Sequence, residues 1–354
     1  MPSPTQRVVL ITGVSRYLGG HLAERLAADS SVERIIGIDT IAPRTSERPR
    51  LGRTEFVRAD IRNPLIAKVI SQARVDTVVH TAALASPRAP RVTLQDQYVT
   101  GTMQLLAACQ TSESIRRVVV ASTTAVYGAS AADPALFTEE MPPTGQAVGY
   151  ARSSIEVENY ARGFARRRPD IPLSVLRLAN LIGPTVDTAL TRYLSMPIVP
   201  TSLGYDARLQ LLHEWDAIEA LHRASAIDHR GVVNVAGEGV VSLAQAVRRA
   251  GRLRLPVPSP AVALVGAAVR NSGVAEVSAE KTSFLNYGRV VDTTRLRTQF
   301  GYTPRYTTEE ALRDYVEARS VLPRLVLGAV EGAQHRLQDR LERLASAAAR
   351  MGAI

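Results

Sequence analysis

Cysteine, lysine and aromatic residues are scarce in this chain of 354 residues, and long apolar runs are missing. The single cysteine, Cys109, cannot form an intrachain disulfide, so nothing indicates an oxidising compartment. The longest apolar run, Ala261–Val269, falls well short of the roughly 18 residues that a membrane span needs. The first apolar run, Val8–Ile11, has the length of a strand rather than of a secretory signal. We therefore expect a cytoplasmic protein without a transmembrane segment.

Positive charge is in excess, but arginine carries nearly all of it. The formal net charge is +10, and only Lys68 and Lys281 among the 43 basic residues are lysines. A protein that binds nucleic acid usually gathers its basic residues in one patch with aromatic residues between them. Here the arginines are spread through the predicted helices, and aromatic residues make up 5% of the chain. This composition favours a small anionic partner and argues against a nucleic acid.

Short runs rich in Val and Ile alternate with helical patterns over the first 180 residues. Runs that are apolar throughout indicate strands buried on both faces, as in a parallel sheet covered by helices. The expected strands are Arg7–Thr12, Arg34–Asp39, Glu55–Ala59, Thr77–His80, Arg117–Ala121 and Leu173–Arg177. The expected helices between them are Leu18–Ala28, Leu65–Gln72, Leu94–Gln110 and Tyr150–Arg168. This order predicts an α/β fold with a doubly wound parallel sheet, the Rossmann arrangement.

The strand–helix alternation becomes less regular beyond Asn180, where proline is frequent. We expect a Rossmann domain over residues 1–180, completed by about residues 209–236. Residues 181–208 and 237–320 are expected to form a smaller C-terminal substrate lobe. In the tail, residues 321–354, apolar side chains from Leu337 to Met351 recur at helical spacing and predict an amphipathic helix. Packing on its own domain or a twin subunit, a frayed end and a membrane-surface helix are the three interpretations of this tail.

A glycine-rich turn follows the first expected strand and leads into the first expected helix. It reads Thr12-Gly13-Val14-Ser15-Arg16-Tyr17-Leu18-Gly19-Gly20. Such a turn presents backbone N–H groups at the positive end of a helix, where a pyrophosphate binds. Asp39 ends the second strand, where a carboxylate accepts hydrogen bonds from a ribose 2′-hydroxyl and repels a 2′-phosphate. The predicted cofactor is NAD, and Arg44 keeps NADP as the alternative.

Six motifs in sequence order resemble those of the NAD-dependent epimerase/dehydratase family. This family of extended short-chain dehydrogenases/reductases includes the UDP-glucose 4-epimerases. The motifs are Thr12-Gly13 to Gly19 (TGxxGxxG), His80-Thr81-Ala82-Ala83 (HxAA), Gly101–Leu106 (GTxNLL), Ser122–Gly128 (SSxxVYG), Arg177–Pro184 (RxxNxxGP) and His213 with Asp216 (HVxD). The resemblance covers about Arg7–Ala311. It implies a nucleotide-sugar substrate and a homodimer formed through the helices Leu94–Gln110 and Tyr150–Arg168.

The expected cofactor contacts follow the first four strands. They are Gly13, Arg16, Tyr17, Leu18, Gly19, Asp39, Asp60, Ile61, Thr81, Ala82 and Ala83. Asp60 and Ile61 are expected near the adenine, and a helix cap is the alternative role for Asp60. Asn180 and Arg208 would contact the nucleotide diphosphate. A loop cap and an exposed surface arginine are their respective alternatives.

Thr123 and Tyr150 match the hydroxyl residue and the tyrosine that act on the sugar hydroxyl in this family. By this resemblance, Tyr150 would take the hydroxyl proton while nicotinamide receives the hydride, and Thr123 would hold the oxygen. The structural alternatives are a strand-end hydroxyl bonded to backbone for Thr123 and a helix-start aromatic packed under the smaller lobe for Tyr150.

Three positions depart from the family pattern. Ser154 stands where the YxxxK motif has a lysine, which binds the nicotinamide ribose and favours the phenolate. A serine replaces the hydrogen bond but not the charge, so about 4 kcal/mol of base activation has to come from elsewhere. Arg16 replaces the middle glycine of the turn, and Tyr98 stands where the family usually has an asparagine.

Two functions follow from these observations. The first is an NAD-dependent, epimerase-like oxidoreductase/isomerase with Thr123 and Tyr150 as the catalytic pair and Ser154 as a weakened substitute for lysine. The second is a catalytically impaired relative that binds a dinucleotide in a sensing or scaffold role. Dehydration is disfavoured, because Thr124 and Ala125 stand where the 4,6-dehydratases have an Asp-Glu pair.

The motif formed by His213 and Asp216 predicts structural rather than catalytic roles. We interpret His213 as structural, and Asp216 as the cap of a helix over Ala217–Ala226 more than as a functional group. The scarcity of histidine–carboxylate clusters predicts that there is no metal site.

Overall fold

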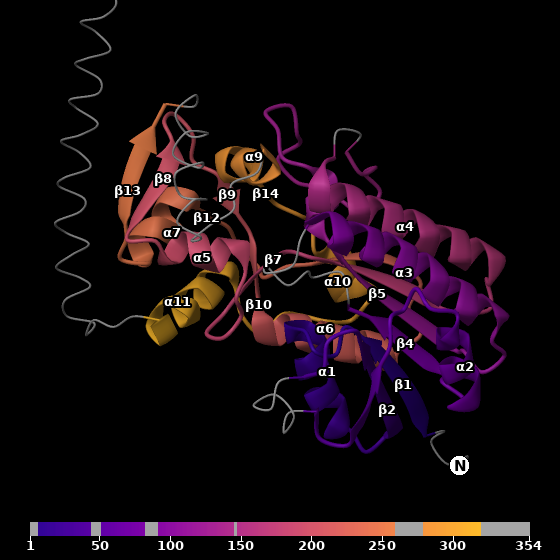
Figure 1. Cartoon of the computed structure of the whole chain (residues 1–354). Coiled ribbons are helices and arrows are strands. Elements are labelled where there is room, and N and C mark those ends of the chain that lie inside the picture. The colour runs from indigo at the N-terminus through magenta and orange to yellow at the C-terminus, as the bar shows by residue number, and fades with distance from the viewer. Residues whose placement is uncertain (1–5, 44–50, 82–90, 145–146, 259–278, 320–354) are drawn as a thin grey trace, which may run out of the picture.

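The computed structural model describes residues 6–43, 51–81, 91–144, 147–258 and 279–319. The helices and strands form two groups, and the larger group is built on a sheet of seven parallel strands. The strand order is β11-β6-β5-β4-β1-β2-β3 (Figure 1). These strands are β1 (Arg7–Thr12), β2 (Val32–Asp39), β3 (Thr54–Arg58), β4 (Thr77–His80), β5 (Arg117–Thr123), β6 (Leu173–Leu178) and β11 (Gly231–Val235). The chain builds the sheet outward from β1 in one direction and then, from β4, in the other. This doubly wound order confirms the predicted fold class.

Helices cover both faces of the large sheet (Figure 1). One face carries α2 (Leu65–Gln72), α3 (Arg91–Thr111) and α4 (Gly149–Arg167), and the other carries α1 (Tyr17–Ala27) and α6 (Glu214–Ala226). Successive residues of β1 explain both layers, because Val9 and Ile11 join the core under α1 and α6, whereas Val8 and Leu10 join the core under α2 to α4. Each fully buried aliphatic side chain contributes about 1.5–3 kcal/mol, so strands buried on both sides hold both helix layers.

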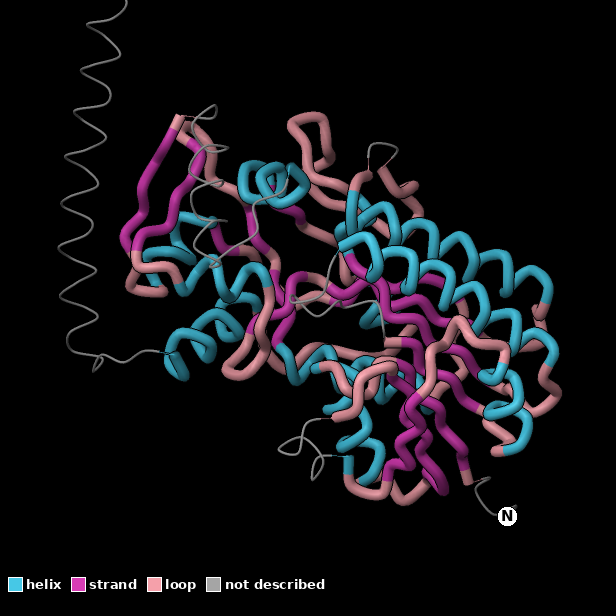
Figure 2. Tube along the Cα trace, viewed as in Figure 1, coloured by secondary structure: helices cyan, strands magenta, loops and turns pink. Residues whose placement is uncertain are grey.

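A second group of short strands and helices lies beyond the carboxyl edge of the sheet (Figure 2). Its strands are β7 (Asn180–Ile182), β8 (Ile198–Ser202), β9 (Arg208–Leu209), β10 (Leu211–His213), β12 (Val241–Ser242), β13 (Leu253–Val257) and β14 (Gly288–Arg289). Its helices are α5 (Ala189–Ser195), α7 (Leu243–Arg249), α9 (Ala279–Tyr287) and α11 (Thr308–Arg319), while α10 (Thr294–Thr298) lies near β11. Leu194, Leu209, Leu211 and Leu312 share a separate hydrophobic core in this group. Leu209 and Leu211 therefore pack with the outer group, whereas Leu212 lies in the core under α1 and α6, and β11 completes the large sheet.

The structure corrects one expectation about a helix start, and two other expectations concern residues that it does not describe. Helix α6 begins at Glu214, so the prediction that Asp216 caps a helix starting at Ala217 is wrong. The predicted tail helix over residues 321–354 lies outside the described residues, as does Arg44. Within the described ranges, no helix is both long enough and apolar enough to cross a membrane.

Candidate functional site

The candidate residues follow neighbouring parallel strands at the points where these strands end. Gly13 follows β1, Asp39 ends β2, Asp60 comes two residues after β3, Thr81 follows β4 and Thr123 ends β5. Because the carboxyl ends of parallel strands meet at one edge, the fold brings these positions together at the crevice where open α/β sheets bind ligands.

The glycine turn is tight, and its two outer glycines are required by geometry. Gly13 has a φ of 76°, and its N–H donates to the Ile38 carbonyl at 2.8 Å. A Cβ at position 19 would lie 2.2 Å from the carbonyl oxygen of Gly13. Arg16 is the N-cap residue of α1 and makes no side-chain capping bond to its first turn. The start of α1 is therefore fitted to an anionic group that approaches the backbone.

Arg16 and Asp39 form an ion pair across this turn. Arg16 Nε lies 3.7 Å from Asp39 Oδ2 and is buried without a hydrogen-bond partner. The Asp39 carboxylate, only 6% exposed, also accepts hydrogen bonds from the N–H groups of Ser15 at 3.2 Å and Ile41 at 3.3 Å. The acceptor expected for the ribose is thus held firmly in place, with a guanidinium next to it.

Tyr17 and Leu18 point in different directions from the start of α1. The Tyr17 hydroxyl lies 2.8 Å from Thr185 Oγ1, which in turn donates to Glu214 Oε1 at 2.9 Å. Leu18 is buried in the core under α1 and α6. Of these two predicted cofactor residues, Tyr17 joins the glycine turn to the segment after β7, and the side chain of Leu18 packs inside the domain.

Asp60 and Ile61 make local contacts. The Asp60 carboxylate pairs with Arg62 at 2.6 Å, and the hydrogen bonds from Arg62 lower the pKa of Asp60 although partial burial raises it. In the first turn of α2, the Leu65 N–H donates a hydrogen bond to Asn63 Oδ1 at 2.9 Å. Asn63 therefore takes the capping role at the start of α2 that was the alternative role for Asp60. Ile61 packs against Gly101 of α3, where a Cβ would lie 2.6 Å from Ile61 Cδ1.

The HxAA motif places a buried histidine behind the site. Thr81 donates to the Thr12 carbonyl at 2.7 Å, and Ala82 and Ala83 lie outside the described residues. Thr102 gives its proton to the Tyr98 carbonyl at 2.7 Å, so His80 Nε2 donates to Thr102 Oγ1 at 2.8 Å. His80 Nδ1 then accepts from the Thr12 hydroxyl at 2.6 Å. Burial lowers the pKa of His80 to about 4, so this link between β1, β4 and α3 is neutral.

Thr123 is the last residue of β5, and Tyr150 is the second residue of α4. Thr123 Oγ1 accepts a hydrogen bond from the Ala125 N–H at 3.2 Å, a bond that does not consume the Thr123 hydroxyl proton. Tyr150 lies in the first turn of α4, with its hydroxyl oxygen buried. Ser154, one turn later, is fully buried and donates to the Tyr150 carbonyl at 3.0 Å. The single proton of Ser154 is therefore bound to its own helix.

A buried ion pair lies one further turn along α4. Arg177 Nη2 meets Glu158 Oε2 at 2.6 Å, and Ser122 donates to Glu158 Oε1 at 2.6 Å. Arg177 also donates to the Tyr127 hydroxyl at 2.7 Å, and Tyr127 donates to Asn234 at 2.8 Å. Burial alone would lower the pKa of Arg177, but the hydrogen bonds and charge of Glu158 raise it. Sequence reasoning missed Glu158, although its spacing of eight residues from Tyr150 was a visible signal.

Asn180 and Arg208 belong to different small sheets. Asn180 is the first residue of β7 and pairs with Leu211 of β10 in parallel register. Arg208 of β9 is exposed and donates to the Ala135 carbonyl at 3.1 Å. The structure thus ties Arg208 to a loop that follows β5 in the chain.

His213 and Asp216 hold the start of α6 against α11 and the segment before it. His213 Nδ1 accepts from the Trp215 N–H at 3.1 Å, and Nε2 lies 2.9 Å from Asp314. Asp216 accepts hydrogen bonds from the Tyr302 hydroxyl at 2.7 Å and from the Arg305 N–H at 2.6 Å. These contacts agree with the structural interpretation of His213.

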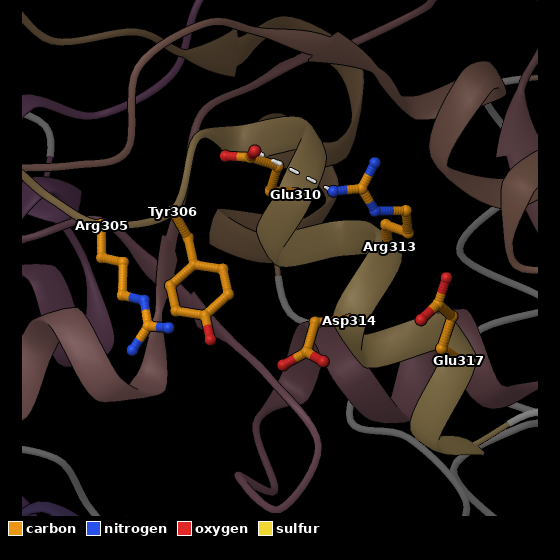
Figure 3. A pocket seen from close by; sticks show the side chains of 6 residues that line it. All are labelled: Arg305, Tyr306, Glu310, Arg313, Asp314 and Glu317. Atoms are coloured by element: carbon orange, nitrogen blue, oxygen red, sulfur yellow. Dashed lines mark ion pairs between the residues drawn. The ribbon is translucent and has the colours of Figure 1, made fainter.

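A cavity of about 280 Å³ lies beside α11 (Figure 3). It is lined by Arg305, Tyr306, Glu310, Arg313, Asp314 and Glu317, and four of these residues come from α11. Arg313 Nη2 lies 3.9 Å from Glu310 Oε1, and the Arg313 side chain is exposed. The cavity belongs to the outer group, has mostly charged side chains in its lining, and contains none of the predicted catalytic residues. Within the described part of the chain, no cluster of histidine, cysteine and carboxylate side chains could hold a metal ion.

Comparisons with known proteins identify the family. The NAD dependent epimerase/dehydratase family matches residues 9–236, which is more than half of the chain. An uncharacterized protein of Mycobacterium tuberculosis is 49% identical over 322 residues, covering 90% of this chain and 85% of the relative. The chain belongs to the NAD dependent epimerase/dehydratase family, which confirms the resemblance drawn from the motifs.

More distant relatives carry names that indicate activities. The UDP-glucose 4-epimerase of Erwinia amylovora is 28% identical over 188 residues, covering 49% of this chain and 53% of that enzyme. The structure of the UDP-glucuronic acid 4-epimerase from Bacillus cereus, in complex with UDP-glucuronic acid and NAD, matches with a TM-score of 0.67. That match covers 88% of this chain and 98% of the epimerase at 19% identity, so it supports the fold alone.

Proposed function

We propose that this chain is an NAD-dependent oxidoreductase/isomerase that epimerises a nucleotide-sugar. The observation that carries the proposal is the common location of the glycine turn, Asp39, Thr123 and Tyr150 at the carboxyl edge of one sheet. The names of relatives that act on UDP-sugars and bind NAD support the substrate class and the cofactor.

The residues between the end of β1 and the start of α1 fit a dinucleotide. Gly19 leaves open the space that a Cβ would fill against Gly13, and the first turn of α1 has no side-chain cap from Arg16. Gly13, Gly19 and the start of α1 would therefore hold the pyrophosphate through backbone N–H groups. Asp39 would accept hydrogen bonds from the adenosine ribose, which favours NAD over NADP.

The chemistry of the chain's own residues is proton transfer and positioning. The nicotinamide supplies hydride transfer when the cofactor is bound. Tyr150 would take the proton of the sugar hydroxyl as the ketone forms, and would return it when the hydroxyl is restored. Thr123 would hold the same oxygen with its hydroxyl, while Asn180 and Arg208 would contact the diphosphate. Rotation of the bound ketone between the two transfers would invert the stereocentre.

Ser154 supports a second candidate, a dinucleotide-binding protein without turnover. Its proton is donated to the Tyr150 carbonyl, and the nearby guanidinium of Arg177 is neutralised by Glu158. A site of this kind would keep affinity for NAD but lack the charge that favours a phenolate.

One experiment separates the two candidates. Small molecules released from the purified protein are identified by mass spectrometry, and NAD, NADP and UDP-sugars are then titrated calorimetrically into the emptied protein. Tight binding of NAD and a UDP-sugar, followed by turnover, supports the epimerase. NAD binding with no sugar and no turnover supports the second candidate, and no dinucleotide binding contradicts both.

The Tyr150→Phe variant tests the assignment of the base. It removes only the hydroxyl that accepts and returns the proton, so we expect kcat to fall by about 10²–10⁴ while the Kd for NAD is unchanged. Steady-state kinetics and calorimetry measure the two quantities. Turnover that survives the change would show that Tyr150 is not the base. Tyr160→Phe on the exposed side of the same helix is the matched control, and it should leave both quantities unchanged.

We also propose that the protein is a homodimer that pairs the outer surfaces of α3 and α4. Each helix has a large apolar side chain that is more than a third exposed, Met103 on α3 and Tyr160 on α4. Pairing these surfaces would remove both side chains from water.

A further inference from the structure

Helices α1 and α6 pack against each other on one face of the large sheet (Figure 1). Both lead the chain away from the carboxyl edge of the sheet, α1 after β1 and α6 before β11. Tyr17 is the first residue of α1, and Glu214 is the first residue of α6. The segment after β7, residues 183–188, contacts both of them through Thr185. Three parts of the chain that are distant in sequence thus meet beside the glycine turn.

The carboxylate of Glu214 holds the segment after β7. It accepts hydrogen bonds from the Thr185 N–H at 3.1 Å, from the Thr185 hydroxyl at 2.9 Å and from the Val186 N–H at 2.6 Å. The Glu214 side chain is buried, and a Cβ at position 183 would lie 2.5 Å from its Cδ. The glycine at position 183 therefore leaves open the space that this carboxylate occupies.

The hydrogen bonds of the three side chains run in one direction, from α1 to α6. Thr185 gives the single proton of its hydroxyl to Glu214. The contact of 2.8 Å between the hydroxyl oxygens of Tyr17 and Thr185 therefore needs Tyr17 as its donor. Tyr17, Thr185 and Glu214 form a relay of two oriented hydrogen bonds, and the second of these is strengthened because it ends on a carboxylate.

The relay begins in the turn that would bind the pyrophosphate. The Gly20 N–H donates to the Arg16 carbonyl at 2.9 Å and closes the first turn of α1. The N–H groups earlier in a first turn have no acceptor within the helix, and such groups bind phosphates. Tyr17 lies within this turn, so the bond made by its side chain restrains the backbone that carries these groups. A ligand binds more tightly when the groups that contact it are already held in place.

Glu219 provides a second link between the same two helices, farther from the glycine turn. Its carboxylate pairs with Arg25 in the last turn of α1 at 2.9 Å. Arg25 lies eight residues after Tyr17, which is about two helical turns. A change at Glu219 therefore affects the packing of α1 on α6 without touching the relay, and it separates an effect on packing from an effect on the turn.

We propose that Glu214 is a positioning residue for the dinucleotide, and that it acts through Thr185 and Tyr17 on the first turn of α1. The inference rests on the proposed dinucleotide site, but it does not depend on the sugar or on turnover. Its consequence is that loss of either hydroxyl weakens the binding of a ligand that carries the pyrophosphate. Binding of adenosine, which has no phosphate, should be affected little.

The test measures ligand binding to the full-length chain. Calorimetry gives the Kd for NAD, ligand-observed NMR gives the Kd for adenosine, and a thermal scan gives the Tm of the unliganded protein. We expect Tyr17→Phe and Thr185→Val each to raise the Kd for NAD by about fivefold or more, and the Kd for adenosine by less than about twofold. Thr185→Ser keeps the hydroxyl, so its Kd for NAD should stay within about twofold of the unchanged protein.

A double variant tests whether the two hydroxyls act as one unit. Thr185→Val already breaks both bonds of the relay, so adding Tyr17→Phe should weaken NAD binding no further. Glu214→Gln leaves one of the donors of Thr185 and Val186 without an acceptor, and it should also raise the Kd for NAD by about fivefold or more. Glu219→Gln is the control, and it should lower the Tm while leaving the Kd for NAD unchanged.

Three results would each overturn the proposal. They are an unchanged Kd for NAD in Tyr17→Phe, additive losses in the double variant, and a loss in Glu219→Gln as large as that in Glu214→Gln. If the unchanged protein bound no dinucleotide, the proposed function would be contradicted and this inference would fall with it. Binding of NAD without any sugar turnover would contradict the epimerase and leave this inference standing.

Discussion

Arg16 and Asp39 place opposite charges at the corner of the sheet where the adenosine ribose is expected. Asp39 is held by two backbone N–H groups, and the guanidinium of Arg16 lies 3.7 Å away. The carboxylate disfavours a 2′-phosphate and the guanidinium favours one, so the choice between NAD and NADP depends on which charge the ribose meets. We expect Asp39 to dominate, because its carboxylate is the ordinary acceptor for a ribose diol.

The Asp39→Asn variant tests this balance. It removes one negative charge but keeps an acceptor of the same shape, and it frees Arg16 to attract a phosphate. We expect the ratio of the Kd for NADP to the Kd for NAD to fall at least tenfold, or about 1.4 kcal/mol. Calorimetric titration of both dinucleotides gives the ratio. Asp228→Asn, an exposed carboxylate paired with Arg117, is the control. An unchanged ratio in Asp39→Asn would mean that Asp39 does not contact the ribose.

One buried, neutral histidine links two strands and one helix of the large sheet domain. His80 joins β4 to β1 through Thr12 and to α3 through Thr102, and burial keeps it uncharged. The pKa of His80 is about 4 in the folded chain, whereas an unfolded histidine has a value near 6.5. The unfolded chain therefore binds more protons between these values, so stability is lost as pH falls through this window.

This linkage predicts an acid-sensitive fold. Between pH 6.5 and pH 4, His80 should remove about 3 kcal/mol from the free energy of unfolding, and above pH 7 it should have no further effect. Urea denaturation at a series of pH values measures the change. His80→Asn cannot bind a proton in this range, so its stability should fall less steeply over the same window. Equal slopes for the two proteins would show that His80 is not the group responsible.

The buried ion pair between Glu158 of α4 and Arg177 of β6 predicts a second effect on stability. Arg177→Met leaves Glu158 charged and buried without its partner, and such changes cost about 3–5 kcal/mol. We expect the melting temperature to fall strongly in a calorimetric scan. Replacing both residues, as Arg177→Met with Glu158→Leu, should recover part of the loss because no unpaired charge remains. A double variant less stable than Arg177→Met would contradict this account.

The whole molecule has two groups of elements and an outer surface that we expect to pair. If α3 and α4 form a dimer interface, Tyr160→Glu places a charge in its apolar centre. We expect the variant to sediment as a monomer where the unchanged protein sediments as a dimer, because burying an unpaired carboxylate is unfavourable. Val240→Glu changes an exposed apolar side chain in the outer group and should leave the mass unchanged. A monomeric unchanged protein would contradict the proposed dimer.

Local patterns in the sequence were enough to predict the fold class, the glycine turn and the missing lysine. Buried parallel strands require near-continuous apolar runs, and the turn requires glycine where a Cβ would meet the backbone, as at Gly19. The strand boundaries followed from the same runs, although β2 begins at Val32 rather than Arg34. The start of α6 was missed, because its cap is His213, a residue that seldom serves as one.

Contacts between distant residues were decided by the tertiary structure alone. The sequence separates Arg16 from Asp39 and Glu158 from Arg177, and each pair meets only because particular elements pack together. Periodicity shows which face of a helix is buried but not which neighbour that face meets. For this reason the sequence by itself showed that position 154 lacks a lysine, and only the packing of α4 on β6 showed that the guanidinium of Arg177 is paired with Glu158.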